Sequence, residues 1–197
     1  EKAIQALSHF LKEKCGSTLA AWLRHFDPDN DQRTTSIVFC RALRQLKFVG
    51  DPAELFAALD DDDSGELCLD EIDEEQAEVW RRFRKWACVT FLGAKDMMES
   101  VGDERATKDK PKPLRIGDFE EGVRRLGWDR GHEELLFYAI DTQGHGKISL
   151  EELAWLDTEC QRQQAKERAK QRSAKVEHRA RSMDLTAAKK TLYRFKG

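Results

Sequence analysis

Apolar residues recur along much of the chain at steps of three to five positions, the spacing expected for one face of an α-helix. An early stripe consists of Leu19, Trp22, Leu23 and Phe26. A longer stripe, between Glu71 and about Leu92, consists of Ile72, Val79, Phe83, Trp86 and Phe91. Because no helix breaker interrupts this second stripe before Gly93, it predicts one continuous helix over 71–92 that joins two halves of the chain.

The two halves repeat one another at a spacing of about 80 residues. Residues 39–46 and 119–126 each place apolar side chains at positions i, i+4 and i+7, which are Phe39, Leu43 and Leu46 in the first copy and Phe119, Val123 and Leu126 in the second. Residues 54–60 match residues 134–141 with one insertion, and residues 65–72 match residues 146–153. Each copy therefore predicts helices joined by loops, and the chain is a duplicated, mainly helical unit.

Local signals mark where some of these elements begin and end. Asp51, Pro52 and Glu54 supply an N-cap, a proline for the first helical position and the acid of a capping box. A helix is therefore expected to start at Pro52. The polar stretch 102–113 contains two prolines and has no apolar period, which predicts a flexible loop.

Charge divides the 197-residue chain into an acidic body and a basic tail. Residues 1–160 carry 22 Lys/Arg and 34 Asp/Glu, a balance of −12, and residues 161–197 carry 12 Lys/Arg and 3 Asp/Glu, a balance of +9. Charged residues make up 36% of the chain, and its longest apolar run, around 86–94, is too short to cross a bilayer. A soluble protein with no transmembrane segment is expected.

The number and spacing of the cysteines indicate the redox environment of the protein. The cysteines are odd in number, widely spaced and without a Cys-x-x-Cys pair: Cys15, Cys40, Cys68, Cys88 and Cys160. This pattern argues against a disulfide framework or a zinc site and favours reduced thiols in a cytoplasmic or cytoskeletal protein. The sequence begins at Glu1 rather than at methionine, so a removed signal or transit segment stays open.

The segment Asp60–Glu71 has the residue types and spacing of a calcium-binding loop. Ca²⁺ takes six to eight oxygen ligands, and a loop of about 12 residues supplies them from positions 1, 3, 5, 7, 9 and 12, with glycine at position 6 for the turn. In this segment the ligand positions are Asp60, Asp62, Ser64, Glu66 through its backbone carbonyl, and Glu71 through both carboxylate oxygens.

Three other positions of this segment complete the pattern or depart from it. Gly65 is the turn glycine, and Leu67 at position 8 is expected in a short strand against a partner loop. Cys68 stands at position 9, where the ligand is often a water molecule, so the thiol is expected to weaken the site without abolishing it. The alternative is an acidic helix-capping loop that holds no ion, and the complete spacing together with the second copy favours the metal site.

The 60–71 loop, its apolar neighbours Leu55, Phe56, Leu59 and Ile72, and the duplicated unit resemble the EF-hand superfamily of calmodulin and centrin. The resemblance covers about residues 15–160. It implies an all-α fold of two lobes, each a pair of helix–loop–helix units. Residues 1–79 would hold loops 27–38 and 60–71, residues 80–160 would hold loops about 102–118 and 141–152, and residues 161–197 would follow as a basic helical tail.

The 141–152 loop keeps part of the calcium pattern, including the first Asp, the glycine Gly146, the position-8 Ile148 and the final Glu. Its candidate ligands are Asp141, Gln143, His145, Lys147 and Glu152. Gln143 offers a carbonyl oxygen, but His145 at position 5 presents a nitrogen that a hard cation disfavours. A single histidine without a second His or Cys at ligand spacing does not indicate a transition-metal site, so a partly degenerate calcium loop is the preferred interpretation.

The other two loops depart further. The 27–38 loop begins with Asp27, Asp29 and Asp31, but Gln32 replaces the glycine and Val38 stands where the bidentate acid belongs. In the 102–118 loop only the exit aligns, with Leu114, Asp118 and Phe119 at positions 8, 12 and 13, and the loop is about five residues too long. Both are expected to complete a pair without binding metal strongly.

The tail has two patterns. Residues 161–181 are basic, with alanines and Val176 as their only large apolar residue, which predicts a solvated helix continuing from Glu152. After Asp184 a basic amphipathic helix is predicted, with apolar residues Leu185, Ala188, Leu192 and Phe195 beside Lys189, Lys190, Arg194 and Lys196. Such a helix could dock in the apolar groove of a lobe, its own or another protein's, or meet a membrane surface, a nucleic acid or a microtubule. Docking on the acidic body is the favoured hypothesis.

No pairing of nucleophile and base, phosphate-cradling glycine loop or zinc pattern is present, so we expect no enzyme. Two functions stay open. One is a calcium sensor or calcium-modulated interaction module that engages a protein target. The other is a structural scaffold or cytoskeleton-associated protein whose loops mostly bind no ion.

Overall fold

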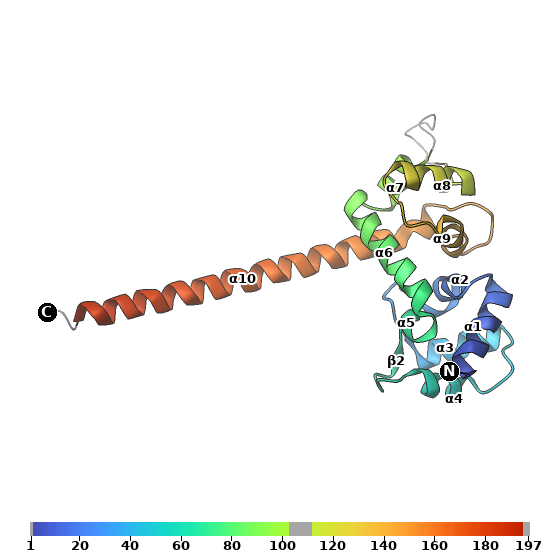
Figure 1. Ribbon diagram of the computed structural model, residues 1–197, viewed down its shortest axis with the longest axis horizontal. Helices are drawn as coiled ribbons and strands as arrows, with labels where there is room; N and C mark the ends of the chain where they lie inside the picture. The colour runs from blue at the N-terminus through green and yellow to red at the C-terminus, as the bar shows by residue number, and fades with distance from the viewer. Residues whose placement is uncertain (1, 103–111, 195–197) are drawn as a thin grey trace. The chain divides into compact units, whose positions relative to one another are not determined.

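The computed structural model describes residues 2–102 and 112–194, and the side chains of residues 4–102 and 112–175. This part of the chain is all-α, with ten α-helices, drawn in chain order in Figure 1. The described residues divide into two units, with the boundary between Glu159 and Cys160. The elements are α1 Lys2–Cys15, α2 Thr18–Ala21, the π-helix η1 Trp22–Phe26, β1 Thr34–Thr35, α3 Ser36–Gln45, α4 Pro52–Leu59, β2 Glu66–Leu67, α5 Leu69–Ile72, α6 Glu74–Thr90, α7 Ala94–Val101, α8 Ile116–Arg125, α9 Glu133–Ile140, the 3₁₀ helix η2 Glu151–Leu153 and α10 Ala154–Arg194.

The internal repeat is visible in two matching helix pairs, α3 with α4 and α8 with α9. Phe39 and Leu43 of α3 are fully buried, and so are Phe119 and Val123 at the matching positions of α8. The helix start predicted at Pro52 is confirmed, because the Asp51 carboxylate caps α4 by accepting a hydrogen bond from the Ala53 N–H at 2.8 Å.

Within each half, two loops meet through short backbone pairings. β1 and β2 are antiparallel, with Thr34 opposite Leu67, so Leu67 lies in the strand that the sequence predicted. In the second half Leu114 and Ile148 exchange two backbone hydrogen bonds of 2.9 and 2.8 Å. These pairings hold the 60–71 loop against the 27–38 loop, and the 141–152 loop against the exit of the 102–118 loop.

The continuous helix predicted over 71–92 is wrong, because the chain breaks at Asp73 into α5 and α6. Asp73 has extended backbone angles (φ −155°, ψ 90°), and its carboxylate caps α6 by accepting the Gln76 N–H at 3.1 Å. Helix α6 then ends at Thr90, three residues before the predicted stop at Gly93, and Gly93 becomes the N-cap of α7.

An aromatic cluster forms much of the core around α6. The fully buried ring of Phe83 lies 5.3 Å from that of Trp128 and 6.0 Å from those of Phe119 and Trp155. Because these partners come from α8, the α8–α9 connection and the start of α10, the cluster joins segments far apart in sequence. Each such aromatic pair adds about 0.5–1.5 kcal/mol beyond the burial of apolar area.

The backbone of α10 is helical from Ala154 to Arg194, so the tail is helical over its described residues. Residues 164–175 are exposed, as expected for a solvated helix. The side chains of the predicted amphipathic residues Leu185, Ala188 and Leu192, and all of Phe195, lie outside the described residues. Within the described part of the chain, no helix is both long and apolar enough to span a membrane.

Candidate metal centre

The 60–71 loop connects α4 to α5 through a tight turn. Helix α4 ends at Leu59, and Asp60 is its C-cap residue. Asp63 (φ 56°) and Gly65 (φ 77°) adopt left-handed backbone conformations, and glycine adopts this conformation without steric cost. The turn at Gly65 predicted from the sequence is therefore present, and it folds the loop back over Asp60.

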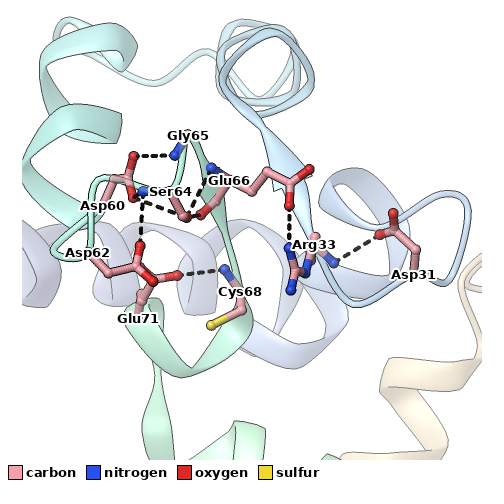
Figure 2. A network of polar contacts seen from close by, with 9 residues as sticks. All are labelled: Asp31, Arg33, Asp60, Asp62, Ser64, Gly65, Glu66, Cys68 and Glu71. Atoms are coloured by element: carbon pink, nitrogen blue, oxygen red, sulfur yellow. Dashed lines mark hydrogen bonds and ion pairs between the residues drawn. The ribbon is translucent and has the colours of Figure 1, made fainter.

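The Asp60 carboxylate organises this turn. Its Oδ1 accepts the Ser64 N–H at 2.9 Å, and its Oδ2 accepts the Gly65 N–H at 2.9 Å (Figure 2). The Asp62 carboxylate accepts the same Ser64 N–H at 3.0 Å. Hydrogen bonds from Ser64 hold the pKa of the Asp62 carboxyl below its ordinary value, so Asp62 is ionised at neutral pH.

The predicted oxygen ligands converge on one small volume. Oxygens bound side by side to Ca²⁺ at about 2.3–2.6 Å lie roughly 2.7–3.7 Å from one another, and oxygens on opposite sides lie roughly 4.6–5.2 Å apart. The Ser64 hydroxyl lies 3.3 Å from Asp60 Oδ1 and 2.8 Å from the Glu66 carbonyl oxygen, which are adjacent-ligand spacings. One carboxylate oxygen from each of Asp60, Asp62 and Glu71 lies within 4.8 Å of the other two, a spacing that fits the coordination sphere.

Glu71 closes the loop from the other side. Its Oε2 accepts the Cys68 N–H at 2.7 Å, which fixes the carboxylate at the start of α5 (Figure 2). Burial, followed by hydrogen bonding to Glu71, raises the pKa of the Cys68 thiol. The thiol is therefore protonated at neutral pH, and a neutral thiol is a poor ligand for a hard cation.

The electrostatics of the loop favour a cation. Residues 60–71 contain seven Asp/Glu and no Lys or Arg. The 27–38 loop contributes Arg33, whose guanidinium donates to the Glu66 carboxylate at 2.6 Å. Glu66 is expected to offer its backbone carbonyl and not its side chain, so this ion pair does not involve a ligand oxygen. No ion pair of the described residues includes the convergent carboxylates of Asp60, Asp62 or Glu71.

The 141–152 loop repeats the backbone hydrogen bonds of the 60–71 loop but presents different candidate metal ligands. Asp141 accepts the N–H groups of His145 and Gly146 at 2.9 and 2.8 Å, as Asp60 does at the matching positions. Glu152, however, uses both oxygens within the loop, because Oε1 accepts the Gln143 N–H at 3.0 Å and Oε2 accepts the Ser149 N–H and hydroxyl at 2.8 Å.

A positive charge also lies at the entrance of this loop. The Arg24 guanidinium donates to the backbone carbonyl of Asp141 at 2.9 Å and to that of Tyr138 at 3.0 Å. With three Asp/Glu and one Lys between 141 and 152, the loop offers a cation fewer negative charges than the 60–71 loop does. The predicted ligands Gln143, His145 and Lys147 contribute no carboxylate, so the donor set favours a weaker site.

In the 27–38 loop the first acid, Asp27, accepts hydrogen bonds from its own loop. Asp27 is 1% exposed, and its carboxylate accepts the N–H groups of Asp31 and Gln32 and the side-chain amide of Gln32 at 3.1 Å. Burial raises the pKa of Asp27 to about 7 despite these hydrogen bonds. Gln32 adopts φ 71° where a glycine is usual, and its side-chain amide oxygen Oε1 accepts the Trp80 indole N–H at 3.1 Å.

The exit of the 102–118 loop has a capping role. The Asp118 carboxylate accepts the Arg115 N–H at 3.3 Å at the start of α8, and Phe119 is buried in the core. Leu114 pairs with Ile148 as described above, which is the position-8 role assigned from the sequence. Residues 103–111 of this loop lie outside the described part of the chain.

Sequence reasoning missed Arg24, Arg33 and Trp80, which shape these loops, and it identified Gln32 only as a replacement for glycine, without its contact to Trp80. Only Gln32 carried a signal, since a non-glycine residue at the turn position requires a compensating contact. The comparisons with known proteins add nothing to this set, because no family model and no curated protein sequence matches the chain. The geometry alone must support a function.

Proposed function

We propose that this chain is a calcium-binding protein of the EF-hand type that holds one Ca²⁺ in the 60–71 loop. One observation carries the proposal: carboxylate oxygens of Asp60, Asp62 and Glu71 lie within 4.8 Å of one another around a left-handed turn at Gly65. Like charges this close repel one another, and a divalent cation converts that repulsion into attraction.

Each ligand has a definite part in the site. Asp60 and Asp62 supply one oxygen each, Ser64 its hydroxyl, Glu66 its backbone carbonyl and Glu71 two oxygens, which gives about six of the oxygens that Ca²⁺ requires. Backbone N–H groups already orient Asp60 and Glu71, so little conformational entropy is lost when the ion binds. A water molecule beside Cys68 would complete the sphere.

Titration calorimetry with Ca²⁺ tests this proposal. The chain should bind one ion, and Glu71→Gln should weaken binding at least about tenfold, because it removes a charge and the bidentate clamp. Glu54→Gln is the matched control, since Glu54 is an exposed acid on α4 outside the loop and should leave the affinity unchanged. Equal affinities for the chain and Glu71→Gln would contradict the proposal.

For the role that follows from binding, we propose a non-enzymatic, calcium-modulated interaction module. Its proposed partner is a basic amphipathic helix of the kind predicted for 183–197, either from this chain or from a protein target. Deleting residues 183–197 should then increase the binding of a hydrophobic dye when Ca²⁺ is present. An unchanged dye signal would remove the own-chain helix as the partner.

A structural scaffold is the second candidate, and a specific observation favours it. Asp27 and Glu152 accept hydrogen bonds from their own loops with both carboxylate oxygens, so these acids hold their loops together through groups of the protein itself. Hydrophobic-dye binding, measured with and without Ca²⁺ beside thermal unfolding, separates the two candidates. An interaction module should change its dye signal on binding Ca²⁺, whereas a scaffold should gain only thermal stability.

A further inference from the structure

A hollow of about 570 Å³ lies on the side of α6, next to the connection between α8 and α9. Its walls come from two segments, residues 82–89 of α6 and residues 127–130 of the connection. None of the proposed calcium ligands lines it, so this surface is separate from the metal centre.

The floor of the hollow is aromatic and apolar. The rings of Trp86 and Trp128 contact each other with centroids 5.5 Å apart, and Trp128 is 3% exposed whereas Trp86 is half-buried. Beside them Val89 is 81% exposed on the face of α6 that lines the hollow. An apolar side chain placed here would cover Val89 and the open part of Trp86, and so remove apolar area from water.

The rim is positively charged, against the balance of the rest of the body. Arg82, Lys85 and Arg130 line the hollow with Asp129 as the one acid, although residues 1–160 as a whole carry −12. Arg130 pairs with Asp129 at 3.3 Å, and Arg82 pairs with Glu78 on its own helix at 2.6 Å. Among the ion pairs of the described residues none includes Lys85, so its ammonium group is available to a partner.

We propose that this hollow is a docking site for an acidic peptide segment of a partner protein that carries a bulky apolar side chain. The apolar side chain packs against Val89 and Trp86, and flanking Asp or Glu residues pair with Lys85 and Arg130. The rim charge repels a basic partner, so the ligand of this hollow differs from the basic amphipathic helix proposed above as a partner. Exposed pairs of this kind confer specificity and fast association more than affinity.

Fluorescence anisotropy with a labelled peptide tests the site. The probe has a central Leu-Phe pair flanked on each side by Asp and Glu, and two control peptides replace the acids by Lys or the central pair by Ser-Ser. The acidic, apolar probe should bind saturably in the presence of EDTA, more weakly at high salt, and more tightly than either control.

The variants use exposed side chains, so the fold is retained. Lys85→Glu combined with Arg130→Glu should weaken the probe about tenfold or more, and Val89→Asp should do so about fivefold. Lys95→Glu, on α7 and not among the residues that line the hollow, is the charge-reversal control for a single site and should have no effect.

The proposal would be overturned by the absence of saturable binding by the acidic probe or by equal binding of the probe to the double variant. Tighter binding of a single-stranded oligonucleotide than of the probe would overturn it too. Self-association of the chain that Lys85→Glu abolishes would also overturn it, because the occupant would then be a second copy. Calcium titrations of the same proteins keep this outcome distinct from the fate of the metal centre.

Discussion

Asp27→Asn should change how the stability of the chain depends on pH. Burial raises the pKa of Asp27 from 3.8 to about 7, so the native state binds a proton more tightly than the unfolded state does. The stability that this group contributes is then fully present below about pH 4 and is lost as the pH rises through 7. This rise in pKa, from 3.8 to about 7, corresponds to roughly 4 kcal/mol of folding stability. Asp27 is buried enough that solvent screening does not reduce this figure much.

Asparagine cannot titrate in this range but has its own cost. It keeps one oxygen for the N–H groups of Asp31 and Gln32, and it turns an NH₂ group toward the Gln32 side-chain amide, which is itself a donor. If Gln32 rotates to accept, the Trp80 indole loses its acceptor, so the variant should lose about 1–3 kcal/mol at every pH. Only the pH dependence reports the titration of Asp27.

Urea unfolding between pH 4 and 8, in EDTA so that ion binding does not contribute, measures the effect. The free energy of unfolding of the variant, relative to the unsubstituted chain, should rise by roughly 4 kcal/mol across this range. Asp29→Asn, an exposed neighbour in the same loop, is the control and should give a nearly constant difference. A pH-independent difference for Asp27→Asn as well would show that Asp27 does not titrate with a raised pKa in the native state.

Two further predictions concern packing and the choice of ligands. Gly122→Ala should destabilise the chain by about 2 kcal/mol in urea unfolding, because the added Cβ would lie 2.3 Å from the backbone oxygen of Val101. Gly117→Ala on the same helix is the control. Its Cβ would meet nothing within 4 Å, so this variant should be neutral or slightly stabilising. Gln143→Asp combined with His145→Asp should add a second calcium site to the calorimetric titration, whereas Thr142→Asp, which adds charge away from a ligand position, should not.

The repeat predicted much of this architecture because each copy carries its apolar positions in a short segment of sequence. The matched faces of Phe39 and Phe119 and the position-8 residues Leu67 and Ile148 occur at fixed offsets along the chain, and all four are buried as expected. The break at Asp73 was also readable, since an Asp followed three residues later by Gln76 is a helix-start signature. The apolar stripe across 72–91 concealed it.

The contacts between segments could not be read from local patterns. Arg24 reaches the carbonyl of Asp141 across 117 positions, and the Gln76 side chain accepts the Leu19 N–H across 57. Such bonds depend on which helix faces meet in three dimensions, and spacing within one segment does not specify that. The cationic rim around Trp86 belongs to the same class, because it combines α6 with a connection some forty positions later.

Diffraction from crystals soaked in Ca²⁺, recorded with the anomalous signal of calcium, shows whether the 60–71 loop holds the ion. We expect a peak about 2.3–2.6 Å from oxygens of Asp60, Asp62, Ser64, Glu66 and Glu71. A peak held by other residues, or a 60–71 loop with no ion at saturating Ca²⁺, would contradict this expectation.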